Sequence, residues 1–174
     1  MLFEDECHVK HGDSLGYIWG RRNKRTSVKM QNERHSKTFF GALDLYSQQF
    51  YLKEYPWANM ESTVDFLKYL MEQFKQARQL ILIWDGASFH KGALIQEFLL
   101  SVNQGLEMKD WKIHCLLFAP NAPEQNPVED CWLKAKNYMR ENIFKNLTFN
   151  DAIKSFKESF DNLTFDFGKL SWYF

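Results

Sequence analysis

The chain has 174 residues, of which 45% are hydrophobic and 17% aromatic, and its formal net charge is zero. This length and composition predict one folded domain over residues 1–174 and exclude a disordered chain. No apolar run approaches the roughly 18 residues of a membrane span, and the N-terminus lacks the basic and apolar regions of a signal peptide. We therefore expect a soluble cytoplasmic protein with no membrane partner.

The cysteines do not indicate a disulfide framework or a zinc site. Cys7, Cys115 and Cys131 are odd in number and show no CxxC spacing. The closest group of candidate zinc ligands is Cys7, His8 and His11, which lacks a full tetrahedral set.

The charge is unevenly distributed along the chain. Residues 21–37 contain seven Lys or Arg and one acid, a local charge of +6, which leaves 15 basic and 21 acidic residues, or −6, in the remainder. Such a segment suits a loop that binds DNA phosphates beside an acidic metal site, although a solvated loop has the same composition.

The first half of the chain predicts three strands and a helix. Residues 2–6 resemble a short strand, with only four residues before Asp5. Residues 37–45 and 48–56 read as two strands joined by a tight polar turn, so the three form an antiparallel meander. Apolar residues at helical spacing predict an amphipathic helix over 62–74.

The second half alternates strands with helices. A continuous apolar run at 80–84 predicts a strand buried on both faces, followed by a helix at 92–102 and a strand at 112–118. Two helices are expected at about 124–142 and 149–161. The pattern predicts an α/β fold with a mixed five-stranded sheet flanked by helices, in which the first three strands are antiparallel and the later ones parallel.

Two acids lie at positions where a sheet carries ligands. Asp85 follows the buried strand at its carboxyl end, where α/β sheets bind ligands, although Asp-Gly also forms turns. Asp5 shares one strand face with Phe3, whereas Glu4 and Glu6 share the other. If Phe3 points to the core, Asp5 is the inward acid of the three.

The helix after the prolines separates two adjacent acids. At 100° per residue, Glu129 lies at the edge of the apolar stripe, together with Lys136 and Arg140, whereas Asp130 points toward solvent. Three carboxylates from strand ends and a helix edge repel unless they hold hard divalent cations, and pairs of Mg²⁺ or Mn²⁺ ions in such sites catalyse phosphoryl transfer.

Three motifs occur in the order of a known family. FEDE at 3–6, WDGASFHKG at 84–92 and APNAPEQNPVEDCWLKAK at 119–136 resemble the catalytic domain of DDE-type transposases of the mariner-like superfamily, in its bacterial insertion-sequence branch. The resemblance extends from residue 1 to about 145. It implies an RNase H-like fold whose acids bind two Mg²⁺ (or Mn²⁺) ions.

The resemblance assigns roles to particular residues. It makes Asp5, Asp85 and Glu129 the catalytic, metal-binding triad. It makes His90 an active-site neighbour that contacts phosphate or orients a carboxylate, with a helix-capping loop histidine as the alternative. Asn126 is expected to cap the helix or fix the loop.

Two further features bear on the resemblance. We expect Trp132 to lie in the core rather than to stack on bases. Gly86 stands where many family members have Asn, a change we expect to be tolerated because the preceding carboxylate is the ligand.

The implied activity is metal-dependent DNA strand cleavage and strand transfer, as in cut-and-paste transposition of an insertion sequence. The partners are then the element ends and target DNA, a homodimer on DNA, and a separately encoded N-terminal half, since no helix-turn-helix module precedes the motifs. The implied location is the bacterial cytoplasm, at the nucleoid when bound to DNA. The expected DNA-binding residues are Arg21, Arg22, Lys24, Arg25, Lys136 and Arg140.

Two alternatives remain open at this stage. A catalytically silent transposase remnant would bind DNA or a partner without binding divalent metal. An RNase H-like nuclease would share the fold and metals but cleave another substrate, which substrate competition would reveal.

Overall fold

The computed structural model describes residues 1–16, 21–24, 27, 35–119, 125–161, 165, 168 and 171. The order of strands and helices agrees with the prediction. The strands are β1 (Leu2–Lys10), β2 (Ser36–Asp44), β3 (Phe50–Tyr55), β4 (Leu80–Trp84) and β5 (Ile113–Leu117). The helices are α1 (Met60–Gln73), α2 (Ala93–Val102), α3 (Val128–Glu141) and α4 (Phe149–Glu158), with short 3-10 helices η1 (His11–Ser14), η2 (Ser88–Lys91) and η3 (Met108–Asp110).

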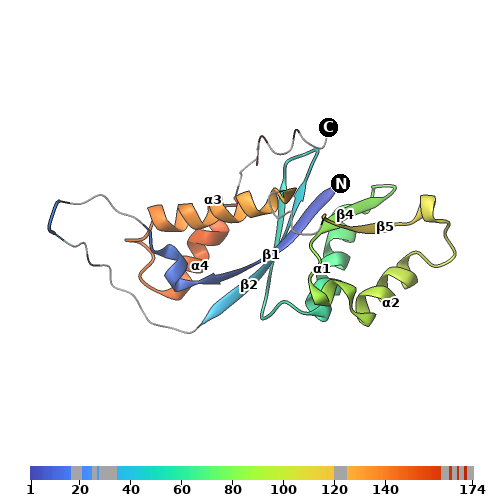
Figure 1. Ribbon diagram of the computed structural model, residues 1–174, viewed down its shortest axis with the longest axis horizontal. Coiled ribbons are helices and arrows are strands. Elements are labelled where there is room, and N and C mark those ends of the chain that lie inside the picture. Colours follow the sequence, from blue (N-terminus) through green and yellow to red (C-terminus); the bar gives the residue numbers. More distant parts are fainter. Residues whose placement is uncertain are drawn as a thin grey trace.

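The five strands form one mixed sheet in the order β3-β2-β1-β4-β5 (Figure 1). β1, β2 and β3 pair antiparallel, whereas β4 is parallel to both β1 and β5. The predicted mixed five-stranded sheet is confirmed. β1 is the central strand, so side chains on either of its faces can be buried.

The first strand is longer than predicted. β1 continues beyond the acids to Lys10 and pairs with β2 along its whole length, from Leu2 opposite Asp44 to Lys10 opposite Ser36. The expectation of a short strand was wrong because Cys7 and Val9 continue the apolar alternation and are buried. Asp5 therefore lies in the middle of a well-paired strand.

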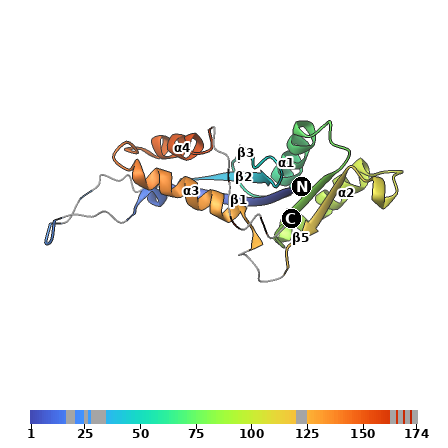
Figure 2. The ribbon, with the colours of Figure 1, turned by 90° about the horizontal axis from the view of Figure 1, so that it is seen from above.

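Helices cover both faces of the sheet (Figures 1 and 2). Phe3, Cys7 and Val9 of β1 pack with apolar residues of α3 and α4, whereas Leu2 packs with those of α1 and α2. We call these the α3 face and the α1 face of the sheet. No helix in the described part of the chain has the length and apolar content needed to cross a membrane.

α3 crosses the sheet at a glycine. Gly41 of β2 pairs with Asp5, and a Cβ atom at Gly41 would lie 2.4 Å from both Cη2 of Trp132 and Cζ of Phe50. A residue without a side chain is needed there for the Trp132 ring to lie against the sheet. Gly41 thus sets how close α3 comes to β1.

Candidate active site

Asp5 lies on the α3 face, where its Oδ2 accepts a hydrogen bond of 3.1 Å from Nε1 of Trp132. Burial raises the pKa of Asp5 from 3.8 to about 7, and the charges of Glu6 and Asp85 add to this. Hydrogen bonds from the backbone of Glu6 and from Trp132 oppose the rise. A carboxyl group with such a raised pKa, next to other acids, gains most from a bound cation.

Asp85 comes directly after the end of β4 and is close enough to Asp5 for its charge to raise the pKa of Asp5. β1 and β4 are parallel, with Phe3 opposite Ile83, so both acids follow that pair by two residues along their chains. Ile83 packs against the α3-face core, whereas Oδ1 of Asp85 lies 3.2 Å from Nδ1 of His90. The side chain is 54% exposed, and its Oδ1 accepts a hydrogen bond of 2.8 Å from the Ala87 amide. The turn-forming role considered as the alternative is therefore present, and it leaves the other carboxylate oxygen accessible.

Asn126 fixes the start of α3. Its Oδ1 accepts a hydrogen bond of 3.1 Å from the Val128 amide, and its Nδ2 lies 3.5 Å from the Glu4 carbonyl oxygen. Asn126 is buried. These contacts are structural ones, joining the helix start to β1.

Glu129 lies in the first turn of α3, between two anchors. Asn126 precedes it by three residues and contacts β1 at Glu4, while Trp132 follows it by three and contacts Asp5. Residues three apart are neighbours on a helix surface, so Glu129 lies beside Trp132 on α3.

The exposures of the adjacent acids on α3 correct one expectation. Glu129 is exposed, whereas Asp130 is only partly exposed and has interactions of its own. We predicted that Asp130 lies in water and Glu129 at the rim of the core. This prediction was wrong, because Glu129 is the more exposed of the two side chains. Helical phase gives the angle around the axis, but the neighbours of a first turn determine how much solvent reaches it.

His90, in η2, lies between two acids. Its ring stacks on Trp84 with the centroids 4.2 Å apart and an interplanar angle of 5°. Nδ1 is 3.2 Å from the carbonyl oxygen and 3.2 Å from Oδ1 of Asp85, and Nε2 is 3.0 Å from Oε1 of Glu6. The N-cap of α2 is Gly92, without a side-chain cap, so His90 does not cap this helix.

Burial lowers the pKa of His90, but the hydrogen bond and charge of Glu6, followed by Asp85, outweigh it, and the net pKa is raised. Acids at both ring nitrogens, Asp85 at Nδ1 and Glu6 at Nε2, therefore favour the protonated imidazole.

Glu4 and Glu6 were missed as site residues. The side chain of Glu4 is 1% exposed, and within the described part of the chain neither carboxylate oxygen has a hydrogen-bond partner. Burial raises its pKa well above the ordinary value, and the charges of Glu6, Asp5 and Asp85 raise it further. The expectation that Asp5 is the inward acid of the three was wrong, because β1 is central and its α1 face is covered as well. The burial of Glu4 could have been predicted only from the central position of β1 in the sheet.

The three predicted ligands are not gathered around one point. Among the described residues, the His, Cys, Asp and Glu side chains whose ligand atoms lie within 4.8 Å of one another are Glu4, Glu6 and His90. Asp5 and Asp85 interact electrostatically across neighbouring strands, and Glu129 lies on the adjoining helix. Asp5, Asp85 and Glu129 offer carboxylate oxygens, which suit Mg²⁺ or Mn²⁺.

The predicted basic residues fall into two groups. On α3, Lys136 Nζ is 4.0 Å from Oδ2 of Asp13 in η1, and Arg140 Nη1 donates a hydrogen bond of 2.7 Å to Oδ1 of Asn137. Both follow Glu129 along the helix, toward η1.

The segment 21–24 is exposed and lies beyond the end of α3 that is distant from Asp5 and Asp85 (Figures 1 and 2). It contains Arg21, Arg22 and Lys24, whereas Arg25 is outside the described residues. We had expected the basic loop to lie next to the acids. Its described part does not lie there. The sequence could not reveal this because η1 and α3 separate the two regions.

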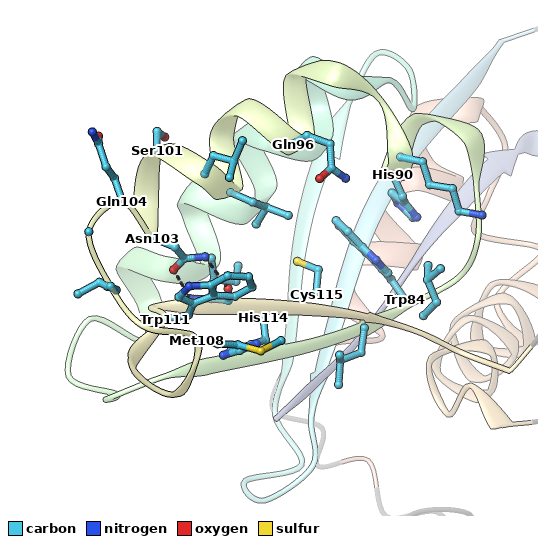
Figure 3. A pocket seen from close by; sticks show the side chains of 18 residues that line it. Trp84, His90, Gln96, Ser101, Asn103, Gln104, Met108, Trp111, His114 and Cys115 are labelled. Carbon is cyan, nitrogen blue, oxygen red and sulfur yellow. Dashed lines mark hydrogen bonds between the residues drawn. The ribbon is translucent and has the colours of Figure 1, made fainter.

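A pocket of about 770 Å³ lies between α2 and the strands β4 and β5. Figure 3 shows Trp84 and His90 together at one end of it and Trp111 toward the other. The pocket borders the acidic region only through His90.

Comparisons with known proteins agree with this fold. No curated protein matches the chain in sequence. The structure is similar to the Mos1 transposase paired-end complex with left transposon end, with a TM-score of 0.64, 14% identity, and coverage of 99% of this chain and 50% of that one. It is also similar to the catalytic domain of Mos1 mariner transposase (0.55, 16%, covering 99% and 73%). A further match is the HTLV-2 integrase catalytic core domain in complex with magnesium (0.54, 14%, covering 98% and 90%).

These similarities confirm the RNase H-like fold of transposase and integrase catalytic cores. The chain spans about half the length of the first Mos1 chain. The family model described as DDE superfamily endonuclease matches residues 1–148, which include all three motifs. The chain therefore belongs to the DDE superfamily endonucleases.

Proposed function

We propose that this chain is the catalytic domain of a DDE transposase of the insertion-sequence branch, which cleaves and joins DNA strands with Mg²⁺ or Mn²⁺. The observation that carries the proposal is the position of three acids in a DDE-family chain. Asp5 lies on β1, Asp85 directly follows the neighbouring parallel strand β4, and α3, which carries Glu129, is joined to β1 beside Asp5.

Asp5, Asp85 and Glu129 would hold a pair of divalent cations. The raised pKa of Asp5, with its burial beside Glu6 and Asp85, indicates a site that is short of positive charge. When bound, such cations lower the pKa of water and stabilise the charge that develops in phosphoryl transfer. The partly exposed Asp85 and the exposed Glu129 leave the site open on the side from which DNA would approach.

Neighbouring residues would orient the acids for this role. The Trp132 N–H fixes one oxygen of Asp5, and the Ala87 amide and His90 Nδ1 fix one oxygen of Asp85. These contacts, with the backbone hydrogen bond from Glu6 to Asp5, fix the orientation of both carboxylates. Asn126 holds the helix that carries Glu129.

DNA would lie along α3. Two of the similar structures are a Mos1 complex with a transposon end and a viral integrase core with magnesium. The 14-residue α3 is about 21 Å long, which matches roughly six phosphates of one DNA strand. Lys136 and Arg140 on that helix, and the exposed Arg21, Arg22 and Lys24 beyond it, would contact phosphates away from the cleaved bond.

A nicking assay on DNA tests the proposal. Wild type should nick DNA with Mg²⁺ or Mn²⁺ and not with EDTA, and Asp5→Asn, Asp85→Asn and Glu129→Gln should each abolish nicking. Asp130→Asn is the matched control, because it removes the adjacent carboxylate on the same helix turn and should leave nicking intact.

If the three variants nick as well as wild type, the triad is wrong. If wild type neither nicks nor binds Mn²⁺, the chain is a silent remnant. Faster cleavage of an RNA–DNA hybrid than of DNA in competition would replace the transposase proposal with a nuclease one.

A further inference from the structure

A second cluster of ligands lies on the opposite face of β1 from Asp5. Glu4 and Glu6 alternate with Asp5 and so point toward the α1 face, where His90 of η2 meets them. Nε2 of His90 is 3.0 Å from Oε1 of Glu6 and 3.8 Å from Oε2 of Glu4. One ligand atom from each residue lies within 4.8 Å of the others.

Glu4 indicates that this cluster is incomplete without a ligand. Its side chain is 1% exposed, and neither carboxylate oxygen has a hydrogen-bond partner among the residues that the structure describes. A buried carboxylate without a partner costs several kcal/mol. The described residue nearest to compensate it is His90, whose Nε2 is already closer to Glu6.

The tautomer of His90 follows from its surroundings. Nδ1 faces two acceptors, the carbonyl oxygen and Oδ1 of Asp85, each at 3.2 Å, so Nδ1 carries a proton. Nε2 then faces two carboxylates, which calls for either a second proton or a cation between them. A metal-ligating histidine typically donates its other N–H to a carbonyl or carboxylate, as Nδ1 does here.

We propose that Glu4, Glu6 and His90 bind one divalent cation that accepts nitrogen as well as oxygen, Mn²⁺ or Zn²⁺, separate from the ions of the proposed triad. Metal–ligand bonds of about 2.1 Å put neighbouring ligand atoms about 3.0 to 3.6 Å apart, so the observed separations need only small side-chain movements. Two carboxylates and a neutral imidazole carry −2, which the cation balances.

This site would be linked to Asp85 through the imidazole ring. The cation would fix Nε2, stacking on Trp84 fixes the ring plane, and Nδ1–H then holds Asp85. Trp84 and His90 lie at one end of the pocket (Figure 3), although the His90 side chain itself is 1% exposed. His90 is then a positioning residue for the acid at the end of β4.

Of the two proposed metal sites, this one offers an imidazole nitrogen, whereas the triad offers oxygen alone. Pulsed EPR on Mn²⁺-loaded, desalted protein can therefore distinguish them. We expect ¹⁴N coupling in wild type and in the Asp5→Asn/Glu129→Gln double variant, but none in His90→Gln. His114→Gln is the matched control, since it removes a half-buried histidine of β5 that lines the same pocket and should keep the signal.

Glu4→Gln/Glu6→Gln provides the second measurement. It should weaken Mn²⁺ binding at the nitrogen-coupled site by about tenfold or more, while circular dichroism and the melting temperature without metal show that the variant folds. Bound Mn²⁺ without nitrogen coupling in wild type would overturn the proposal, as would coupling that survives His90→Gln. A melting temperature of the Asp5→Asn/Glu129→Gln double variant that neither Mn²⁺ nor Zn²⁺ raises would overturn it too.

Discussion

Replacing Asp5 with Asn should stabilise the metal-free protein while abolishing its proposed activity. The carboxyl group is buried beside Glu6 and Asp85, which raises its pKa to about 7. Asparagine has nearly the same shape, and its oxygen can still accept the hydrogen bond from Trp132. The change therefore removes an unfavourable charge without removing the contact.

The size of the effect follows from the two pKa values. The unfolded chain releases the proton near 3.8, whereas the folded chain keeps it up to about 7. Because the folded state binds more protons between these values, its stability falls as the pH rises through this window, and the loss is complete above the folded pKa. The difference corresponds to about 4 kcal/mol, which we take as the upper limit of the gain at high pH.

Urea unfolding in EDTA, measured from about pH 4 to pH 8, is the assay. The free energy of unfolding of Asp5→Asn should match that of wild type near pH 4 and exceed it by about 2 to 4 kcal/mol near pH 8. In a second series with Mg²⁺ in place of EDTA, the difference should be smaller, because Mg²⁺ stabilises wild type. Asp65→Asn is a control of opposite sign, since Lys53 and Tyr55 lower the pKa of Asp65 through hydrogen bonds. If the difference in free energy of unfolding does not change with pH, or if Asp5→Asn is less stable than wild type at pH 8, then the buried charge of Asp5 does not destabilise the protein.

Three further changes test the packing and the DNA surface. Gly41→Ala should cost about 1 to 3 kcal/mol of stability and reduce nicking, because its Cβ would lie 2.4 Å from the Trp132 ring; unfolding and nicking assays measure both. Trp132→Phe should raise the pKa of Asp5 further, since it removes the N–H that favours the charged form, and the pH dependence of stability should shift upward. Lys136→Ala should weaken DNA binding and lower the slope of log K against log salt by about 0.7 to 0.9, as titrations at several salt concentrations would show.

Two matched substitutions control these changes. Gly12→Ala meets no atom within 4 Å and should leave stability and nicking unchanged. Lys154→Ala removes an exposed cation from α4 and should leave the salt slope unchanged. If Gly12→Ala destabilises as much as Gly41→Ala, close packing on Trp132 is not the cause; if both lysine changes lower the slope equally, α3 has no special role.

The sequence predicted the fold well because its apolar patterns are strong. The run LILIW at 80–84 is continuous and became β4, and the spacing over 62–74 became α1 with shifts of one or two residues. Alternation also placed Asp5 correctly on the side of Phe3. These features depend on local spacing, which a single sequence contains.

The details of the site depend on contacts that the sequence does not contain. Alternation separated Glu4 and Glu6 from Asp5, but only the central place of β1 and the helices on both faces determine that Glu4 is the most buried of them. Helical phase placed Glu129 at the edge of the apolar stripe but misjudged its exposure relative to Asp130. The pairing of His90 with Glu6 joins residues 84 positions apart.

Anomalous diffraction from crystals grown with Mn²⁺ would show where the metal ions bind. We expect density for Mn²⁺ within about 2.0 to 2.4 Å of carboxylate oxygens of Asp5, Asp85 and Glu129. Mn²⁺ bound elsewhere on the chain, with no peak at coordinating distance from Asp5, would contradict this expectation.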